Sequence, residues 1–146
     1  MRFMILLKAD QDTEAGKMPD ENLLRDMMDF NQALVDAGIM LGGDGLQPTS
    51  KGAKVQFADG RTTVTEGPFP LTGEQLAGFW IWQCASKQEA IEWVKKVPMP
   101  MASGTAEIEI RQIFDAADFG GEFTPEMREQ EEKMRAEVAA RQAASS

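Results

Sequence analysis

Two carboxylates, Glu66 and Asp44, have the local surroundings best suited to proton transfer in this 146-residue chain. Glu66 opens the loop EGPFP at 66–70, whose prolines stiffen the chain and whose glycine permits close backbone approach. A carboxylate held beside an aromatic side chain in a partly dry cleft has a raised pKa and can act as a general acid or base. Asp44 follows two glycines at a predicted strand end, where loops often carry function. Both are candidate catalytic residues. The alternative is a solvated Glu66 and an ordinary turn aspartate at 44.

Several other side chains are candidates for ligand contacts. Asp10 follows the first predicted strand and is placed to join the same rim as Asp44. Arg61 starts a hairpin strand and suits an anionic ligand, although most hairpin arginines are simply solvated. The loop residues Gly67, Pro68 and Phe69 and the indole of Trp80 are further candidates. The candidate ligand-binding residues are therefore Asp10, Arg61, Gly67, Pro68, Phe69 and Trp80.

The composition excludes several kinds of catalytic and metal site. The chain has no histidine, which excludes Ser-His-Asp triads, Cys-His pairs and metal sites that use imidazole. The acids at 10, 12, 14 and 21 imitate a calcium loop, but Ala15 stands where that loop requires glycine. The sequence GGDG at 42–45 lacks the spacing of a dinucleotide-binding fingerprint. We therefore expect neither a metal nor a cofactor.

Charge and hydropathy limit the partners and the location. The net charge is −9 and no block of basic residues stands out, which disfavours a nucleic acid partner. No apolar run approaches the length of a membrane span, so no membrane partner is expected. The single cysteine, Cys84, excludes an intrachain disulfide and fits a cytoplasmic location.

Apolar periodicity predicts the elements of the first part of the chain. The run RFMILLK at 2–8 is typical of a buried strand, and a polar loop follows at 9–17. A helix is predicted to begin at Pro19 and to end at Gly38, with an apolar stripe of Leu23, Met27, Phe30 and Leu34. Residues 39–41 begin a second strand, which closes on the glycine-rich turn at 42–45.

The next elements repeat the same order after a hairpin. The sequence KVQFADGRTTV at 54–64 alternates around Asp59-Gly60, which predicts a type I′ turn. A strand is predicted at 78–84, and Ser86 opens a capping box for a helix that runs to Val97. Residues 106–113 alternate apolar and charged, as a half-exposed strand does. The order β-α-β, hairpin, β-α-β predicts a ferredoxin-like α+β fold, βαββαβ, with an inserted β-hairpin.

The C-terminal part of the chain is predicted to be separate. Residues 115–123 are interpreted as a linker, and Thr124 and Pro125 as the start of a helix over 125–141. Its apolar stripe is narrow, so this amphipathic helix rests on the domain or packs against a partner. The predicted organisation is a domain at 1–114 and an extension at 115–146.

The motifs at 42–46, 64–69, 74–80 and 90–98 (GGDGL, VTEGPF, EQLAGFW and AIEWVKKVP) together resemble the YCII-related proteins. More narrowly, they resemble the branch named for its Asp-Gly-Pro-Phe (DGPF) motif, here Glu66-Gly67-Pro68-Phe69. The resemblance implies a fold that dimerises sheet to sheet, as in dimeric α/β barrels. Such a homodimer would cover Trp80 and Trp82. The His-Asp pair proposed as an active site in some relatives is absent, because Glu21 and Val97 stand near those positions.

Three functions remain open from the sequence. The first is a homodimer that binds a small molecule in a cleft beside the EGPF loop. The second is a metal-independent enzyme that uses Glu66 or Asp44 as general acid or base. The third is a protein-interaction module that uses the C-terminal helix.

Overall fold

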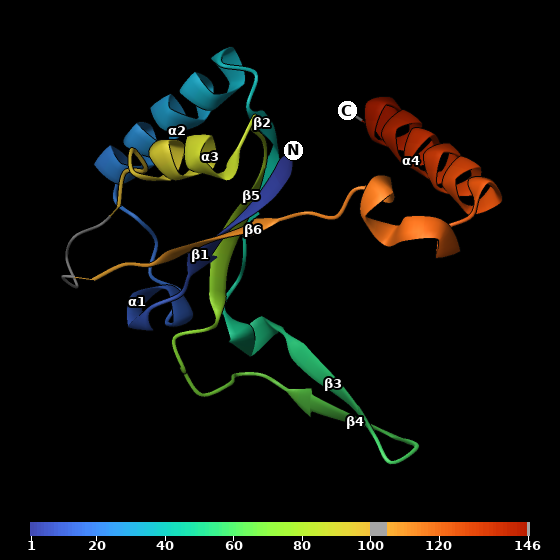
Figure 1. Cartoon of the computed structure of the whole chain (residues 1–146). Coiled ribbons are helices and arrows are strands. Elements are labelled where there is room, and N and C mark those ends of the chain that lie inside the picture. Colours follow the sequence, from blue (N-terminus) through green and yellow to red (C-terminus); the bar gives the residue numbers. More distant parts are fainter. Residues whose placement is uncertain (100–104, 146) are drawn as a thin grey trace. The chain divides into compact units, whose positions relative to one another are not determined.

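The computed structural model describes residues 1–99 and 105–145 of the chain (Figure 1). The chain divides into two compact units, Met1–Ile113 and Phe114–Ser146. The elements of the first unit are β1 (Arg2–Lys8), α1 (Gln11–Glu14), α2 (Glu21–Asp36), β2 (Met40–Gly45), η1 (Thr49–Lys51), β3 (Ala53–Ala58), β4 (Arg61–Glu66), β5 (Leu76–Gln83), α3 (Lys87–Val94) and β6 (Ile108–Gln112).

Four strands form an antiparallel sheet in the order β2-β5-β1-β6, and β3 pairs with β4 in a separate two-stranded sheet. The helices α2 and α3 lie on one side of the four-stranded sheet (Figure 1). In each βαβ unit the two linked strands are therefore separated by one antiparallel strand. This is the ferredoxin-like arrangement, so the predicted α+β class with an inserted hairpin is confirmed.

Local signals explain most element ends, with small corrections. Asp20, not Pro19, begins the first long helix: its side chain caps α2 by accepting a hydrogen bond from the Leu23 amide at 2.8 Å. Gly38 follows the end of α2 with φ +73°, as predicted. The predicted type I′ turn is confirmed, because Asp59 and Gly60 have φ values of 51° and 73°.

Four segments differ from the prediction. The polar loop at 9–17 contains the short helix α1, and the linker at 115–123 contains the 3-10 helix η3 (Ala116–Glu122). The second helix, α3, ends at Val94 rather than at Val97. The sequence GGDG is not a turn. It is the end of β2, where Gly43 pairs with Trp80 and Asp44 pairs with Phe79 of β5.

The core lies between the sheet and the helices α2 and α3. Its largest fully buried side chains are Trp82, Phe3, Ile5 and Leu34. Trp80 is also buried, at 5% exposure, and its ring lies 5.8 Å from that of Phe30 on α2. The expectation that a dimer covers Trp80 and Trp82 is therefore wrong, because the protomer's own helices cover them.

The other face of the sheet carries a smaller apolar patch. Met4 pairs with Ile81 and Leu6 pairs with Phe79, and all four alternate with core residues along β1 and β5. Each is half-buried. We call these four side chains the open-face patch, because they point away from the side that α2 and α3 cover.

The second unit consists of η3 and the helix α4 (Pro125–Ser145). Thr124 caps α4 by accepting from the Met127 amide at 3.3 Å, as predicted. The rings of Phe114, Phe119 and Phe123 pack against one another in sequence, in tilted pairs with centroid separations of 5.2 and 5.4 Å. None of the helices in the described ranges combines the length and apolar character of a membrane span.

Candidate functional site

A cleft of about 1490 Å³ opens at the end of the sheet where β1 finishes. Its walls come from the loop at 9–19, the N-terminal half of α2, the ends of β2 and β5, and residues 71–74 and 105–107. Apolar side chains such as Leu23, Met27 and Phe79 line it beside polar groups. A large, mostly apolar concavity with a few polar groups is the usual form of a small-molecule site.

Trp80 forms part of the inner wall of this cleft together with Asn31. The indole Nε1 of Trp80 donates a hydrogen bond to Oδ1 of Asn31 at 3.0 Å, which joins β5 to α2. The close approach of β2 is possible because residue 43 is glycine. A Cβ there would lie 2.7 Å from both the Phe79 carbonyl oxygen and Cδ1 of Trp80. Gly43 thus has a packing role that its sequence context did not reveal.

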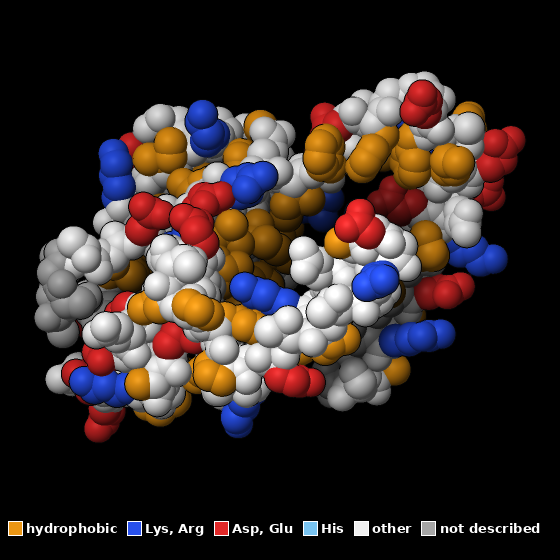
Figure 2. Space-filling view, turned by 90° about the horizontal axis from the view of Figure 1, so that it is seen from below, with side chains coloured by type: hydrophobic (Ala, Val, Ile, Leu, Met, Phe, Trp, Pro, Cys, Tyr) orange, Lys and Arg blue, Asp and Glu red, His pale blue; other side chains and the backbone are white. Residues whose placement is uncertain are grey.

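Acidic side chains outnumber basic ones along the cleft. The acids are Asp10, Asp12, Asp44, Glu74 and Glu107, and the bases are Lys8 and Lys17. Figure 2 shows, from below, acidic and basic groups standing among hydrophobic side chains on the surface. The lining therefore favours a neutral or cationic ligand over an anionic one.

Lys8 is held by two carboxylates at the mouth of the cleft. Its Nζ donates to Oε2 of Glu74 at 2.7 Å and to Oε1 of Glu109 at 3.1 Å, and the side chain is only 9% exposed. The hydrogen bonds to Glu74 and then Glu109 raise the pKa of Lys8. The bonds from Lys8 and then Arg111 lower the pKa of Glu109. Lys8 is therefore a charged structural anchor rather than a nucleophile.

The remaining acids of the cleft differ in how they are used. Asp10 caps α1, because its Oδ1 accepts from the Thr13 amide at 2.9 Å. Asp12 forms an ion pair with Lys17, with 3.7 Å between Oδ2 of Asp12 and Nζ of Lys17. Within the described residues, no cation forms an ion pair with Asp44 or Glu107. These two carboxylates are consequently the groups best able to receive a positive charge from a ligand.

The EGPF loop does not line the cleft. Glu66 is exposed at the end of β4, where it pairs with Ala53. A Cβ at Gly67 would overlap the Thr49 carbonyl oxygen, so only glycine fits there. The Gly67 amide donates to the Gly52 carbonyl at 2.9 Å. In this chain Gly67 therefore packs the end of the β3–β4 hairpin against η1.

The next residues of the loop are tied to η1 and α1. The Phe69 amide donates to Oγ1 of Thr49 at 3.1 Å, and that hydroxyl donates to Glu14 at 2.6 Å. The ammonium of Lys54 lies 4.3 Å from the centre of the Phe69 ring. Pro68 is exposed and lies between these anchors. The bonds to Thr49 give Phe69 a structural place beside the cleft rather than in it.

The structure brings together only some of the predicted site residues. Asp10, Asp44 and Trp80 line one cleft, whereas Glu66, Gly67, Pro68, Phe69 and Arg61 do not. Arg61 pairs with Ala58 next to the hairpin turn and is exposed. Within residues 1–99 and 105–145, no group of three or more Cys, Asp or Glu is arranged to hold a metal ion.

Two further lining residues, Asn31 and Glu107, were missed from the sequence. Asn31 falls at the spacing of the apolar stripe of α2, four residues after Met27 and three before Leu34. A polar residue at such a position signals a buried hydrogen bond, so this residue was detectable. Glu107 had no signal of its own, because charged residues alternate with apolar ones throughout the strand that follows.

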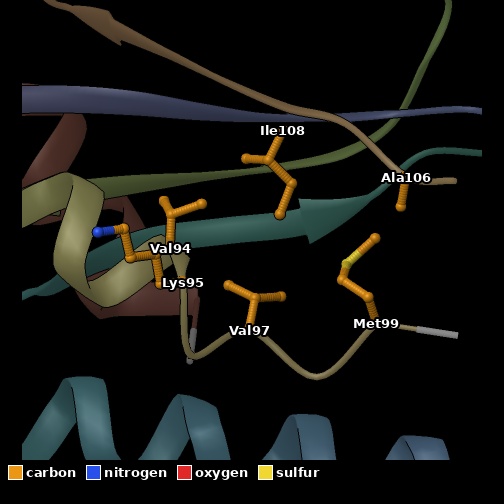
Figure 3. Close-up of a pocket in the computed structure, with 6 residues that line it drawn as sticks. All are labelled: Val94, Lys95, Val97, Met99, Ala106 and Ile108. Atoms are coloured by element: carbon orange, nitrogen blue, oxygen red, sulfur yellow. The ribbon is translucent and has the colours of Figure 1, made fainter. Parts of the chain in front are cut away.

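A second, smaller pocket of about 480 Å³ lies beside α3 and β6 (Figure 3). The side chains of Val94, Val97, Met99 and Ile108 converge on it, and Lys95 is the one charged lining residue among those that the structure describes. None of the predicted site residues lines this pocket. Because the described side chains that line it are apolar apart from Lys95, and because it has about a third of the volume of the cleft, it is a weaker candidate.

Comparison with known proteins places the first unit in a family. Residues 1–115 match the family described as the YCII-related domain. An uncharacterised protein of Rhizobium meliloti (strain 1021) is 31% identical over 115 residues, which are 77% of this chain and 92% of that relative. The family match spans the whole of Met1–Ile113, and therefore all the walls of the cleft.

Proposed function

This chain belongs to the YCII-related domain family, and we propose that it is a cytoplasmic homodimer of the DGPF branch that binds a small cationic molecule in the cleft. The observation that carries the proposal is the excess of carboxylates over cations in a cleft with an apolar wall. Asp44 and Glu107 would receive the positive group, and Phe79, which shares a sheet face with Asp44, would contact the apolar body.

The proposed ligand charge is tested with aromatic probes of similar size and different charge. Benzylamine, protonated at pH 7, and benzoate share a ring and size, and benzyl alcohol is the neutral member of the set. A ligand at ten times its Kd stabilises a domain by about 1.4 kcal/mol, which a thermal-shift measurement resolves. We expect a shift with benzylamine and none with benzoate. Equal shifts with both, or a shift with benzoate alone, would contradict a cation site.

The place of binding is tested with a matched pair of variants. Asp44→Asn removes a carboxylate of the cleft, and Asp29→Asn removes an exposed carboxylate of α2 outside it. We expect the benzylamine shift to fall in Asp44→Asn and to persist in Asp29→Asn. If both variants keep the full shift, the amine binds elsewhere.

The proposed homodimer uses the open-face patch. Met4, Leu6, Phe79 and Ile81 form a continuous apolar row across β1 and β5, which a second copy would cover. Sedimentation of the full chain tests this, with Ile81→Asp as the variant expected to be monomeric. A folded wild-type monomer at about 50 μM, well above the Kd of a standard interface, would contradict the proposal.

An enzymatic role is the second candidate, and the position of Asp44 in the cleft favours it. A proton-transfer carboxylate must reach its substrate, and Asp44 meets that condition, whereas Glu66 does not line the cleft. Once a ligand is known, turnover that is lost in Asp44→Asn and kept in Glu66→Gln would support catalysis by Asp44.

An interaction role for the second unit is the third candidate. Met127, Met134 and Val138 of α4 are 50%, 52% and 55% exposed, and Phe114 is 66% exposed. Such exposed apolar side chains favour a protein partner. Deleting residues 114–146 should abolish that association while the first unit stays folded.

A further inference from the structure

The hairpin formed by β3 and β4, residues Ala53–Glu66, has an apolar face that its own protomer leaves uncovered. We call these residues the arm. Val55 pairs with Val64 and Phe57 pairs with Thr62, so these side chains share one face. Phe57 is 79% exposed, Val64 59% and Val55 51%. Lys54, Gln56 and Thr63 alternate with them and lie on the opposite face.

The arm is built as a defined structure rather than a loose loop. Its turn has the type I′ geometry that matches strand twist, and its base is held by the bond from the Gly67 amide to the Gly52 carbonyl. Every residue from Ala53 to Glu66 is nevertheless exposed. An isolated two-stranded hairpin is marginally stable in water, and alternation of this kind is typical of a sheet with one buried face.

We propose that each arm lays its apolar face on a second copy of this chain, next to that copy's open-face patch. The inference rests on the proposed homodimer and adds a specific interface to it. Figure 1 shows the arm leaving the end of the four-stranded sheet and projecting away from the side occupied by α2 and α3. A second copy packed on the open-face patch would therefore stand on the side toward which the arm projects.

Charge favours a second copy as the occupant. The arm carries Lys54 and Arg61 against Asp59 and Glu66, so its net charge is zero, whereas the whole chain has a net charge of −9. The arm is thus a neutral part of an acidic molecule. Contact through a neutral segment avoids much of the repulsion between two like-charged chains.

Interface size points the same way. A stable dimer buries roughly 800 Å² per partner and engages roughly 20–30 residues a side. The open-face patch offers four apolar side chains, Met4, Leu6, Phe79 and Ile81, all half-buried within the protomer. The exposed Phe57, Val64 and Val55 supply further apolar area where that patch alone is small.

The test compares two substitutions on opposite faces of the arm. Phe57→Asp places a charge on the apolar face, and Thr63→Asp places the same charge on the polar face. Burial of one phenylalanine corresponds to about a tenfold to hundredfold change in Kd. We expect sedimentation equilibrium of the full chain to show a dimer Kd raised at least about tenfold by Phe57→Asp and changed less than about threefold by Thr63→Asp.

The outcomes separate the arm from the dimer. If the wild type is monomeric, both proposals are wrong. If Ile81→Asp is monomeric while Phe57→Asp keeps the wild-type Kd, the dimer stands and the arm contact is wrong. Equal weakening by Phe57→Asp and Thr63→Asp would also overturn the arm contact, because the effect would not belong to one face.

Hydrogen exchange supplies an independent readout without a change in the arm. In the wild-type dimer the amides of residues 53–66 should exchange slowly. In Ile81→Asp, whose substitution lies outside the arm, they should exchange at least about tenfold faster, as expected of an uncovered hairpin. Identical arm exchange in the two proteins would contradict the proposal.

Discussion

The indole Nε1 of Trp80 and the side-chain oxygen Oδ1 of Asn31 are joined by a hydrogen bond of 3.0 Å between the sheet and α2. Trp80 is 5% exposed, so its N–H has little access to water and depends on this acceptor. The bond also orients the Asn31 amide within the cleft wall. One contact therefore serves both core stability and the shape of the proposed binding site.

Replacing Asn31 by alanine should cost stability because it leaves the Trp80 N–H without an acceptor. A buried donor without a partner costs about 1–3 kcal/mol. Asn22→Ala is the matched control, because Asn22 is an exposed residue of the same helix. Urea unfolding should show a loss for Asn31→Ala that Asn22→Ala does not share. Equal midpoints for the two variants would show that the hydrogen bond contributes nothing measurable.

The two neighbouring glycines of β2 should respond oppositely to alanine. A Cβ at Gly43 would lie 2.7 Å from Cδ1 of Trp80, whereas a Cβ at Gly42 meets no atom within 4 Å. Overpacking of this kind costs about 1–3 kcal/mol, and Gly42→Ala should be neutral or slightly stabilising. Thermal unfolding of both variants tests this. Weaker tryptophan near-UV dichroism in Gly43→Ala alone would locate the disturbance at Trp80.

Thr49 should anchor the loop at 67–69 through its hydroxyl. That hydroxyl accepts from the Phe69 amide at 3.1 Å and donates to Glu14 at 2.6 Å. Thr49→Val keeps the shape and removes both bonds, at a cost of about 1–3 kcal/mol, whereas Thr49→Ser keeps the hydroxyl. Hydrogen exchange at the Phe69 amide should accelerate in the valine variant only. Equal acceleration in both variants would show that the effect does not depend on the hydroxyl.

Periodicity predicted the order of elements because each helix and strand of the first unit buries one stripe or face. It could not assign the tryptophans, because β5 is apolar on both faces: Phe79 and Ile81 alternate with Trp80 and Trp82. Alternation shows which residues share a face, but only α2 and α3 decide which face is the core. The predicted dimer role of the tryptophans failed for that reason.

The candidate site was predictable only where the signal was local or positional. Asp10 and Asp44 follow predicted strands, and both line the cleft. The role of Gly43 depends on Trp80, a residue far along the chain, so local sequence suggested a turn instead. Gly67 and Phe69 were predicted to form part of a pocket wall. Their contacts with Thr49 join segments that are distant in the sequence, so the local sequence could not show that their role is structural.

The pairing of Glu109 with Lys8 should make stability depend on pH in the acid range. The pKa of Glu109 is lowered in the folded protein, first by the hydrogen bond from Lys8 and then by that from Arg111. The stabilisation is therefore fully present above the unfolded value of about 4.5 and is lost as pH falls through the lower folded value. The pKa of Lys8 is raised above 10.5 in the folded protein. The stabilisation that Lys8 contributes is therefore fully present below pH 10.5 and is lost only as pH rises through its higher folded pKa.

Urea midpoints measured from pH 7 to pH 3 should fall less steeply in Glu109→Gln than in the wild type. Glu107→Gln, two residues away, should keep the wild-type slope. If Glu109→Gln also keeps that slope, the ion pair does not govern acid stability.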